Sequence, residues 1–335
     1  MSIDNEVKMP RAQPSRSTPV AVWTERELLN GEKVDALVVI LRSKGCSWSN
    51  RSGCLMCGYN NDCDPSVTPE DLARQFEHAM DKHEGQPYLK IYTSGSFFDP
   101  EEVDFESRDS ILESAGGKVE HILVESRPEF VSKETLDAAL NSVKSLEVAI
   151  GLETADDAVR GKCINKGFSF AGYAGAVKVL NDNGIMVRTY LLLKPPFLTE
   201  RKAIADVQES IEKVSEMTQT ISVNPVNVQR GTAVEGLWKR GLYRPPWLWS
   251  LVEVLKKTTE ARLVSAPSGG GTRRGAHNCR KCDRSILNAL RDFNLNADGA
   301  VFDDINCDCR DEWLDTLELE PLAGTSGDLA RLMRP

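Results

Sequence analysis

Three cysteines near the N-terminus have a spacing suited to binding iron or zinc. Cys46, Cys54 and Cys57 form the pattern C-x7-C-x2-C. Three thiolates on a cluster of four irons leave one iron open to a further ligand, as in a reactive [4Fe–4S] cluster. The same thiols could instead bind zinc if a fourth ligand, such as Cys63, lay nearby. The spacing by itself leaves both alternatives open.

Four more cysteines form two close pairs near the C-terminus, with 24 residues between the pairs: Cys279 and Cys282, then Cys307 and Cys309. Two pairs on separate segments supply the four ligands of a tetrahedral zinc ion. We therefore expect a structural Zn²⁺ site, with a second iron–sulfur cluster as the alternative. Nine cysteines in all, an odd and clustered number, indicate metal chemistry in a reducing compartment rather than disulfides.

Strands and helices alternate through the middle of the chain and must position these thiols. Apolar runs of strand length occur at residues 36–41, 88–92, 121–124, 146–150, 186–193 and 220–223. Helical spacing occurs at 69–83, with Thr68 as N-cap, and at 132–140, 169–183 and 200–217. This α/β alternation predicts a parallel sheet covered by helices, an open partial (βα)6 barrel of the TIM type with chemistry at the C-terminal strand ends.

Composition divides the chain into three predicted parts. Residues 1–30 are polar and rich in proline, so we expect an extension draped over the body or partly disordered. Residues 31–265 hold the predicted barrel. Residues 266–335 follow the run Ser268-Gly-Gly-Gly271 and form a small cysteine-rich appendage that we expect to bind zinc.

Polar side chains follow several of the predicted strands. The second strand runs into Ser94, Gly95 and Ser96, where glycine lets the backbone approach a ligand. The third runs into Glu125, Ser126 and Arg127, and the fourth into Glu153. Arginine can donate two hydrogen bonds to a carboxylate, and glutamate can accept from two ribose hydroxyls. We therefore expect a small-molecule site at this end of the barrel.

Together these features resemble the radical S-adenosylmethionine (SAM) superfamily. The cysteine motif follows the first predicted strand, and Met56 precedes its last cysteine. The seven-residue gap resembles the branch that contains the Elongator catalytic subunit. The resemblance implies that SAM binds the open iron of the cluster, with cofactor contacts from the strand-end residues Ser94, Gly95, Ser96, Glu125, Ser126, Arg127 and Glu153. Arg188, within the fifth predicted strand, either joins them or forms a structural ion pair.

Within that superfamily, residues 30 to 310 are similar to the radical SAM subunits of archaeosine synthases, through Glu125-Ser-Arg-Pro128, Asn224-Pro-Val-Asn-Val-Gln229 and Gly275-Ala-His-Asn-Cys279. The resemblance implies a lyase or oxidoreductase acting on archaeal tRNA. A partner subunit joins lysine to a 7-deazaguanine in the D-arm, and this chain, supplied with an electron by a donor, breaks the lysine C–N bond to leave archaeosine. Asn224, Asn227, Gln229 and Arg230 are the substrate candidates.

Two other readings share these residues. A different radical SAM enzyme, acting on tRNA or a small molecule, would keep every cluster and SAM residue and change only the substrate. A zinc-bearing RNA-binding module without enzymatic activity would use Cys46, Cys54 and Cys57 structurally. Iron content and SAM cleavage separate the enzyme from the module, and product analysis separates the enzymes.

Charge is unevenly distributed along the chain. The formal net charge is −9, yet residues 201–280 carry 13 Lys and Arg against 7 Asp and Glu. This basic stretch predicts a tRNA-binding face that includes Arg230, Lys239, Arg240, Arg273 and Arg274, with the alternative that these charges only solvate helix surfaces. The sequence has neither a run of membrane-spanning length nor a signal-peptide core, so we expect a cytoplasmic protein without membrane contact.

Overall fold

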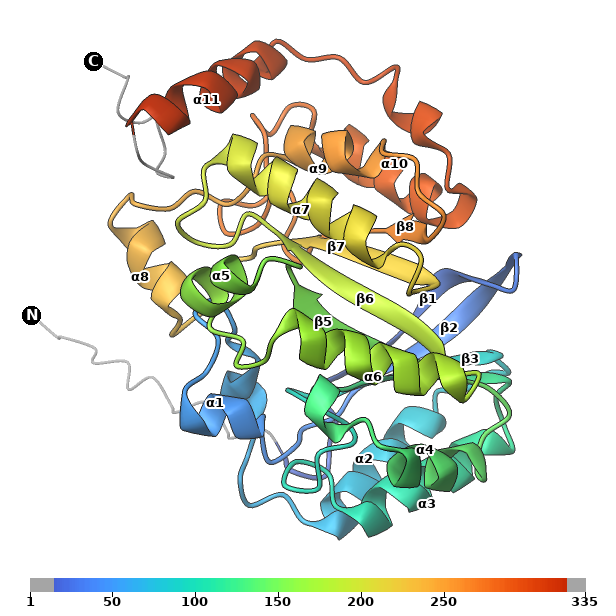
Figure 1. Ribbon diagram of the computed structural model, residues 1–335. Coiled ribbons are helices and arrows are strands. Elements are labelled where there is room, and N and C mark those ends of the chain that lie inside the picture. Colours follow the sequence, from blue (N-terminus) through green and yellow to red (C-terminus); the bar gives the residue numbers. More distant parts are fainter. Residues whose placement is uncertain (1–14, 324–335) are drawn as a thin grey trace, which may run out of the picture.

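A computed structural model describes residues 15–323 of the chain. Its centre is one curved sheet of eight strands in the order β1 to β8 (Figure 1). The first two strands are antiparallel, and all later neighbours are parallel. The strands are β1 (Ala21–Leu29), β2 (Glu32–Ile40), β3 (Tyr88–Tyr92), β4 (His121–Glu125), β5 (Leu146–Glu153), β6 (Met186–Leu193), β7 (Thr220–Pro225) and β8 (Arg262–Val264).

The predicted partial α/β barrel is confirmed, and its six predicted strands correspond to β2 to β7. Helices cover the outer face of the sheet (Figure 1). In chain order the helical segments are α1 (Ser47–Arg51), η1 (Tyr59–Asp62), α2 (Pro69–Met80), α3 (Phe105–Gly116), η2 (Pro128–Phe130), α4 (Lys133–Leu140), α5 (Asp157–Val159), η3 (Arg160–Ile164), α6 (Phe170–Asp182), α7 (Glu200–Val214), α8 (Ala233–Lys239), α9 (Leu248–Leu255), α10 (Asp283–Asn296), η4 (Gly299–Phe302) and α11 (Cys309–Ala323).

Local sequence explains where the long helices begin. Thr68 caps α2 by accepting a hydrogen bond from the Asp71 amide, and the Asp71 carboxylate in turn accepts one from the Thr68 amide. Ser169 caps α6 by accepting a hydrogen bond from the Gly172 amide, and Gly184, at a φ of +68°, follows the end of this helix. These caps confirm two helix starts that the sequence predicted.

Part of the predicted extension, which was expected to drape over the body or be partly disordered, is instead strand β1 of the sheet. Residues 21–29 pair with β2 along their whole length, whereas residues 1–14 of the predicted extension lie outside the described part. The turn between the strands is Asn30-Gly31, both at positive φ, a two-residue hairpin signal present in the sequence. The strand was missed because it lies at a sheet edge and keeps many polar side chains exposed.

One apolar core lies between the sheet and its helices. It contains alternate residues of the strands, such as Leu89 and Ile91 of β3, together with side chains of the covering helices. The same core includes Ile286 and Phe293 of α10 and Trp313 of α11. The C-terminal helices therefore pack directly on the barrel, and a domain boundary near residue 265 stays a prediction.

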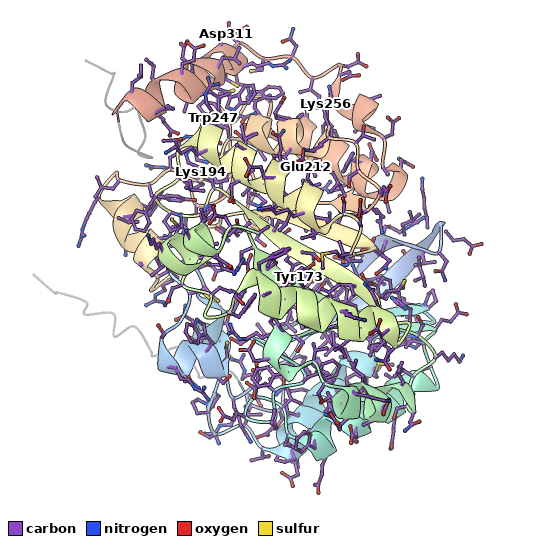
Figure 2. All side chains as sticks on the ribbon, viewed as in Figure 1. Tyr173, Lys194, Glu212, Trp247, Lys256 and Asp311 are labelled. Atoms are coloured by element: carbon purple, nitrogen blue, oxygen red, sulfur yellow. The ribbon has the colours of Figure 1, made fainter. Side chains whose placement is uncertain are left out.

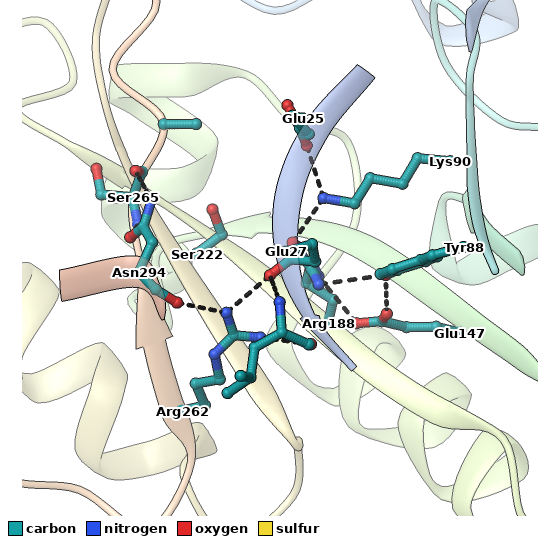
Figure 3. A network of polar contacts seen from close by, with 12 residues as sticks. Glu25, Glu27, Tyr88, Lys90, Glu147, Arg188, Ser222, Arg262, Ser265 and Asn294 are labelled. Carbon is teal, nitrogen blue, oxygen red and sulfur yellow. Dashed lines mark hydrogen bonds and ion pairs between the residues drawn. The ribbon is translucent and has the colours of Figure 1, made fainter. Parts of the chain in front are cut away.

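The other face of the sheet encloses a polar lumen, and its N-terminal end is filled by ion pairs (Figure 3). Glu27 of β1 lies 2.6 Å from Lys90 Nζ and 2.7 Å from Arg262 Nη2, the latter on β8. Glu147 of β5 lies 2.8 Å from Arg188 Nε. Because β1 and β8 are the two edges of the sheet, Glu27 bridges across the barrel opening. We call this buried network the lumen floor.

Arg188 therefore takes the structural alternative offered by the sequence. It is 5% exposed, and its guanidinium contacts Glu147 and Glu27. It precedes by several residues the C-terminal end of β6, where cofactor contact was expected. Arg188 lies in the strand as predicted, but it pairs with Glu27 and Glu147 of the lumen floor. These two carboxylates lie in the lumen at the same level as Arg188.

We expect Glu27→Gln to lower the free energy of unfolding by about 3–5 kcal/mol, because it leaves buried Lys90, Arg188 and Arg262 with too little negative charge. Urea denaturation measures this. Glu25→Gln is the matched control, since Glu25 also contacts Lys90 from β1 but is 38% exposed in its side chain; its expected cost is about 0–1 kcal/mol. Equal effects of the two variants would contradict the floor's role.

A second buried ion group attaches α11 to the barrel. Lys194, directly after β6, lies 2.6 Å from Glu200 and 3.3 Å from Glu320 of α11. Glu200 also accepts hydrogen bonds from the Trp247 amide and the Ser250 hydroxyl. Lys194 and Trp247 lie close together in this region (Figure 2). The strand end, α7 and α11 are thus joined through side chains that water does not reach.

Candidate active site at the barrel mouth

The predicted metal thiols lie in the loop that follows β2. We define residues 42–59 as the cysteine loop. Short helix α1 begins directly after Cys46, and the loop is held by backbone bonds from the Leu55 amide to the Ile164 carbonyl and from the Val234 amide to the Leu55 carbonyl. α1, α5 and α8 gather at one end of the barrel, opposite the β1–β2 turn (Figure 1). The loop is therefore fixed at the C-terminal strand ends.

The three thiols of this loop influence one another. Burial, together with the nearby Cys54 and Cys46 thiols, raises the pKa of Cys57 to about 11 overall, against a hydrogen bond from the Tyr59 backbone that lowers it. Burial also raises the pKa of Cys54, although Lys166 opposes the shift. In the described part of the chain these sulfurs, with or without Cys63, do not converge on a single-ion site.

Gly95 brings the second strand end directly against the loop. A Cβ at this position would lie 2.7 Å from Cys46 Sγ and 2.8 Å from Glu102 Oε2. No larger residue fits without movement of the thiol. The glycine predicted to allow close approach does so, and the group that it approaches is Cys46.

Glu102, which the sequence analysis missed, organises the predicted cofactor turn. Its carboxylate accepts hydrogen bonds from the amides of Ser94, Gly95 and Ser96, at 2.8, 3.0 and 2.6 Å, and from the Ser43 hydroxyl. These three amides therefore already have an acceptor and are not free to bind a ligand. The signal was weak, because Glu102 lies beyond the turn in a segment with no regular periodicity.

An unpartnered polar atom remains beside this turn. The Thr93 hydroxyl is buried and has no hydrogen-bond partner among residues 15–323. Thr93 follows β3 directly and precedes the turn that touches Cys46. Buried polar groups without partners cost free energy, so this hydroxyl, beside a cradle closed to any Cβ, fits a polar ligand placed against the cysteine loop.

Arg127 connects the third strand end to the same loop. Its guanidinium lies over the rings of Trp48 and Phe168, at 5.4 and 5.3 Å, and donates to the Lys166 carbonyl and to Glu129. Its neighbour Ser126 is buried, and the Ser126 hydroxyl donates to the Arg127 carbonyl. Arg127 is thus positioned beside α1, whereas the Ser126 hydroxyl is directed to the backbone.

Glu153 and Lys166 form an ion pair at the mouth. Their Oε1 and Nζ atoms lie 2.6 Å apart. Glu153 adopts a φ of +69° where the register of β5 shifts, and a Cβ at Gly151 would lie 2.8 Å from Lys166 Nζ. Burial lowers the pKa of Lys166, but Glu153 and Cys54 raise it above its usual value overall. Lys166, absent from the sequence prediction, places a positive charge beside the cysteine loop.

Glu125 ends β4 on the lumen side. Leu123, two residues earlier on the same face, packs in the lumen with Ala149. Burial raises the pKa of Glu125 to about 7 overall, although hydrogen bonding from Tyr190 and the charge of Lys166 oppose the shift. The carboxyl therefore titrates near neutrality at the barrel mouth.

Of the four predicted substrate residues, Gln229 contacts the cysteine loop, whereas the other three contact other segments. The Gln229 side chain accepts a hydrogen bond from the Gly58 amide, next to Cys57, so it supports the cysteine loop. Asn224 bonds to the Ser222 hydroxyl and the Ala266 amide. Asn227 lies beside Gly269, and Arg230 is exposed while its carbonyl accepts from Asn61. Sequence order alone could not show that Gln229 faces the loop.

The C-terminal cysteines form a compact group. The four sulfurs of Cys279, Cys282, Cys307 and Cys309 lie within 4.8 Å of one another. Measured pairs are 3.5, 3.6 and 4.0 Å apart, near the ~3.8 Å edge of a tetrahedron with zinc–sulfur bonds of about 2.3 Å. Burial raises the pKa of Cys279, but the amides of Lys281 and Cys282 reduce it to about 7 overall. The group fits one tetrahedral ion.

The predicted basic face is smaller than the sequence count suggests. Lys239 and Arg274 contact Glu235, Arg244 stacks on Trp247 in the interior, and Arg262 belongs to the floor. Arg230, Arg240 and Arg273 are exposed. Tyr243, Trp247 and Trp249, three aromatic residues of the same stretch, are buried.

None of the helices in residues 15–323 has the length and apolar character needed to cross a membrane.

No protein-family model matches the chain. The archaeosine synthase subunit beta of Methanosarcina acetivorans is 43% identical over 324 residues, which cover 92% of this chain and 93% of that protein. The same subunit of Thermococcus kodakarensis is 41% identical over 307 residues, covering 87% and 94%.

A more distant likeness agrees with the predicted Elongator branch. Elongator complex protein 3 of Schizosaccharomyces pombe is 24% identical over 154 residues, covering 46% of this chain and 28% of that protein. The two archaeal relatives match nearly from end to end at far higher identity, and the predicted resemblance is confirmed. The chain belongs to the family of archaeosine synthase beta subunits.

Proposed function

We propose that this protein is a radical SAM enzyme of tRNA modification that cleaves the lysine C–N bond of a lysine-bearing 7-deazaguanine in the D-arm of archaeal tRNA, leaving the formamidine of archaeosine. The supporting observation is the contact of Gly95 with Cys46, which brings the predicted cofactor turn against the cysteine loop. Family membership supports the substrate, because both archaeal relatives are archaeosine synthase subunits.

Cys46, Cys54 and Cys57 would hold a [4Fe–4S] cluster, and the groups around Thr93, Arg127 and Glu153 would hold SAM. Together the two cofactors, when bound, supply a 5′-deoxyadenosyl radical able to remove hydrogen from an unactivated carbon. The chain itself fixes the geometry. Glu102 holds the turn at Gly95, and Gln229 holds the loop at Gly58. The walls of the mouth are thereby set before any ligand arrives.

This proposal includes partners. The lysine-transferring subunit would supply the adducted tRNA, and a separate electron donor would reduce the cluster. The test is mass spectrometry of tRNA nucleosides from cells lacking the protein: loss of archaeosine with accumulation of the lysine adduct is expected. Accumulation of an unrelated hypomodified nucleoside, with archaeosine unchanged, would favour a different radical SAM modification.

We expect Arg127→Ala and Glu153→Gln to weaken SAM binding by roughly 10-fold or more while iron content stays normal, because each removes a charged contact without removing a thiol. Equilibrium dialysis with SAM on the iron-loaded protein measures the effect. Glu129→Gln is the control, since Glu129 contacts the same guanidinium but its side chain is 43% exposed. Wild-type SAM affinity in both variants would contradict these assignments.

The C-terminal thiols would hold Zn²⁺ in a structural role. Trp249 Nε1 donates to Cys309 Sγ, and Asn278 Nδ2 donates to Cys282 Sγ. Such outer contacts orient metal ligands. Sulfur separations near 3.5–4.0 Å suit one ion bound by four thiolates, whereas a cubane places each thiolate on a different iron. Elemental analysis distinguishes the two.

We expect a triple change of Arg230, Arg240 and Arg273 to glutamine to weaken tRNA binding and to reduce the slope of log affinity against log salt by about 2–3, if each arginine neutralises one phosphate. Filter binding at several salt concentrations measures this. These arginines lie on segments joined to the mouth, for example through Asn61 and the Arg230 carbonyl.

The control for the basic face is a triple change of Lys118, Lys133 and Lys178 to glutamine. These lysines are exposed on the segments after α3, in α4 and in α6, and removing them changes the net charge equally. An equal loss of salt slope in both triple variants would show that the arginines act only through overall charge.

A further inference from the structure

Glu125 is the lumen carboxylate without a cation of its own. Glu27 and Glu147 are neutralised on the floor, and Glu153 is neutralised by Lys166. Among residues 15–323, no Lys, Arg or His lies within ion-pair distance of Glu125. Lys166 is near enough to influence it, but its ammonium is held by Glu153. Glu102 also has no cation within ion-pair distance in this part of the chain, but its carboxylate accepts hydrogen bonds from three amides and from the Ser43 hydroxyl. Glu125 is thus the acidic group at the mouth that neither a cation nor backbone amides compensate.

Glu125 lies near the cysteine loop. The Glu125 carbonyl accepts a hydrogen bond from the Phe97 amide, and the Arg127 amide donates to the Ser96 hydroxyl. The end of β4 therefore lies against the turn whose Gly95 touches Cys46. The charges of Lys166, Glu102 and Glu153 also influence the pKa of Glu125. Glu125 therefore lies among groups that surround the thiols, and it remains partly open to solvent.

We infer that Glu125 binds the cationic amidine of the substrate, at the nitrogen next to the carbon from which hydrogen is removed. This inference rests on the proposed function and assigns to the substrate a residue that the sequence had assigned to SAM. Addition of the lysine amine to a nitrile gives an amidine, and amidines are protonated at neutral pH. A carboxylate can accept two parallel N–H bonds from such a group, as it does from arginine.

The pairing has a clear physical use. A cation in the partly buried mouth needs a counter-charge, and Glu125 supplies it without taking Lys166 from Glu153. The amidine would be held in one orientation at the strand ends while its alkyl arm passes the thiols. Glu125 would thereby select tRNA that already carries the adduct over tRNA that carries the neutral nitrile.

The test is binding to the iron-loaded protein without reductant, so that no turnover occurs. Three tRNAs serve as probes: one with the lysine adduct, one with a pentylamine adduct that has the amidine but no amino-acid group, and one with the neutral nitrile base. We expect Glu125→Gln to weaken both adducts equally, by roughly 30-fold or more, and to leave the nitrile tRNA unchanged.

SAM affinity and iron content should be unchanged in Glu125→Gln, whereas Glu153→Gln, the matched mouth variant, should weaken SAM binding instead. A loss of affinity confined to the lysine adduct would show that Glu125 binds the α-ammonium group. A loss of SAM affinity would show that Glu125 contacts the cofactor. Either result would overturn the inference. Wild-type protein that binds the adduct no better than the nitrile would instead overturn the proposed function.

A pH series adds a readout that a purely structural role would not change. The groups facing Glu125 are Tyr59, Tyr92, Glu102, Glu153, Lys166 and Tyr190. Only ionised Glu125 pairs with the amidine, so adduct affinity should fall as pH drops below about 7. Because hydrogen bonding from Tyr190 lowers this pKa, Tyr190→Phe should move the midpoint to higher pH, and Glu125→Gln should abolish it. An unmoved midpoint in Tyr190→Phe would count against the inference.

Discussion

Single replacement of Cys46, Cys54 or Cys57 by alanine is expected to remove the iron chromophore and to reduce SAM cleavage roughly 1000-fold or more. Even groups that only support metal ligands cost about 10–100-fold when changed, and loss of a thiolate removes a ligand itself. Iron content and 5′-deoxyadenosine release measure the two effects. The fold should persist, because the loop lies at the strand ends and its thiols are outside the main core.

Cys63→Ala is the matched control, because Cys63 lies near the same loop, with its sulfur 3.8 Å from the Ser43 hydroxyl. It should keep full iron and full SAM cleavage. If a loop variant retained both, the cluster assignment would be wrong, and if Cys63→Ala lost both, the ligand set would have to include Cys63.

Replacement of Cys282 by serine is expected to lower the free energy of unfolding by roughly 5 kcal/mol or more, since metal binding to such sites contributes directly to folding. The four thiols join the segment before α10 to the start of α11. Both helices pack on the barrel core, so loss of the ion should loosen them together. Thermal unfolding and zinc content measure the change, and a strong chelator should reproduce it in the wild-type protein.

Cys163→Ser is the control for this prediction. Cys163 lies in η3 and is not part of the four-thiol group, so its replacement should leave zinc content and the unfolding midpoint close to those of the wild type. A Cys282 variant with unchanged stability would show that the group has no structural metal.

The sequence by itself determined the features that depend on local order. Ligand spacing is local, so C-x7-C-x2-C and the two C-terminal pairs were visible without a fold. Strand ends are local too, because an apolar run stops where polar residues begin. Since parallel strands bring their C-terminal ends to one edge, the sequence could place the cysteine loop, Gly95, Arg127 and Glu153 at one mouth. Even β1 had a local signal, because Asn30-Gly31 is a sequence typical of a two-residue hairpin turn.

Only the tertiary structure decided which partner each charged side chain takes. Gln229 meets Gly58 across 171 residues and Arg188 meets Glu27 across 161, and no periodicity encodes such pairings. Strand order and the closing of β1 toward β8 determine which carboxylates find a cation inside the lumen. Glu27, Glu147 and Glu153 find one, and Glu125 does not. The physical reason is that burial makes an ion's partner a matter of geometry, which the chain sets only when distant strands come together.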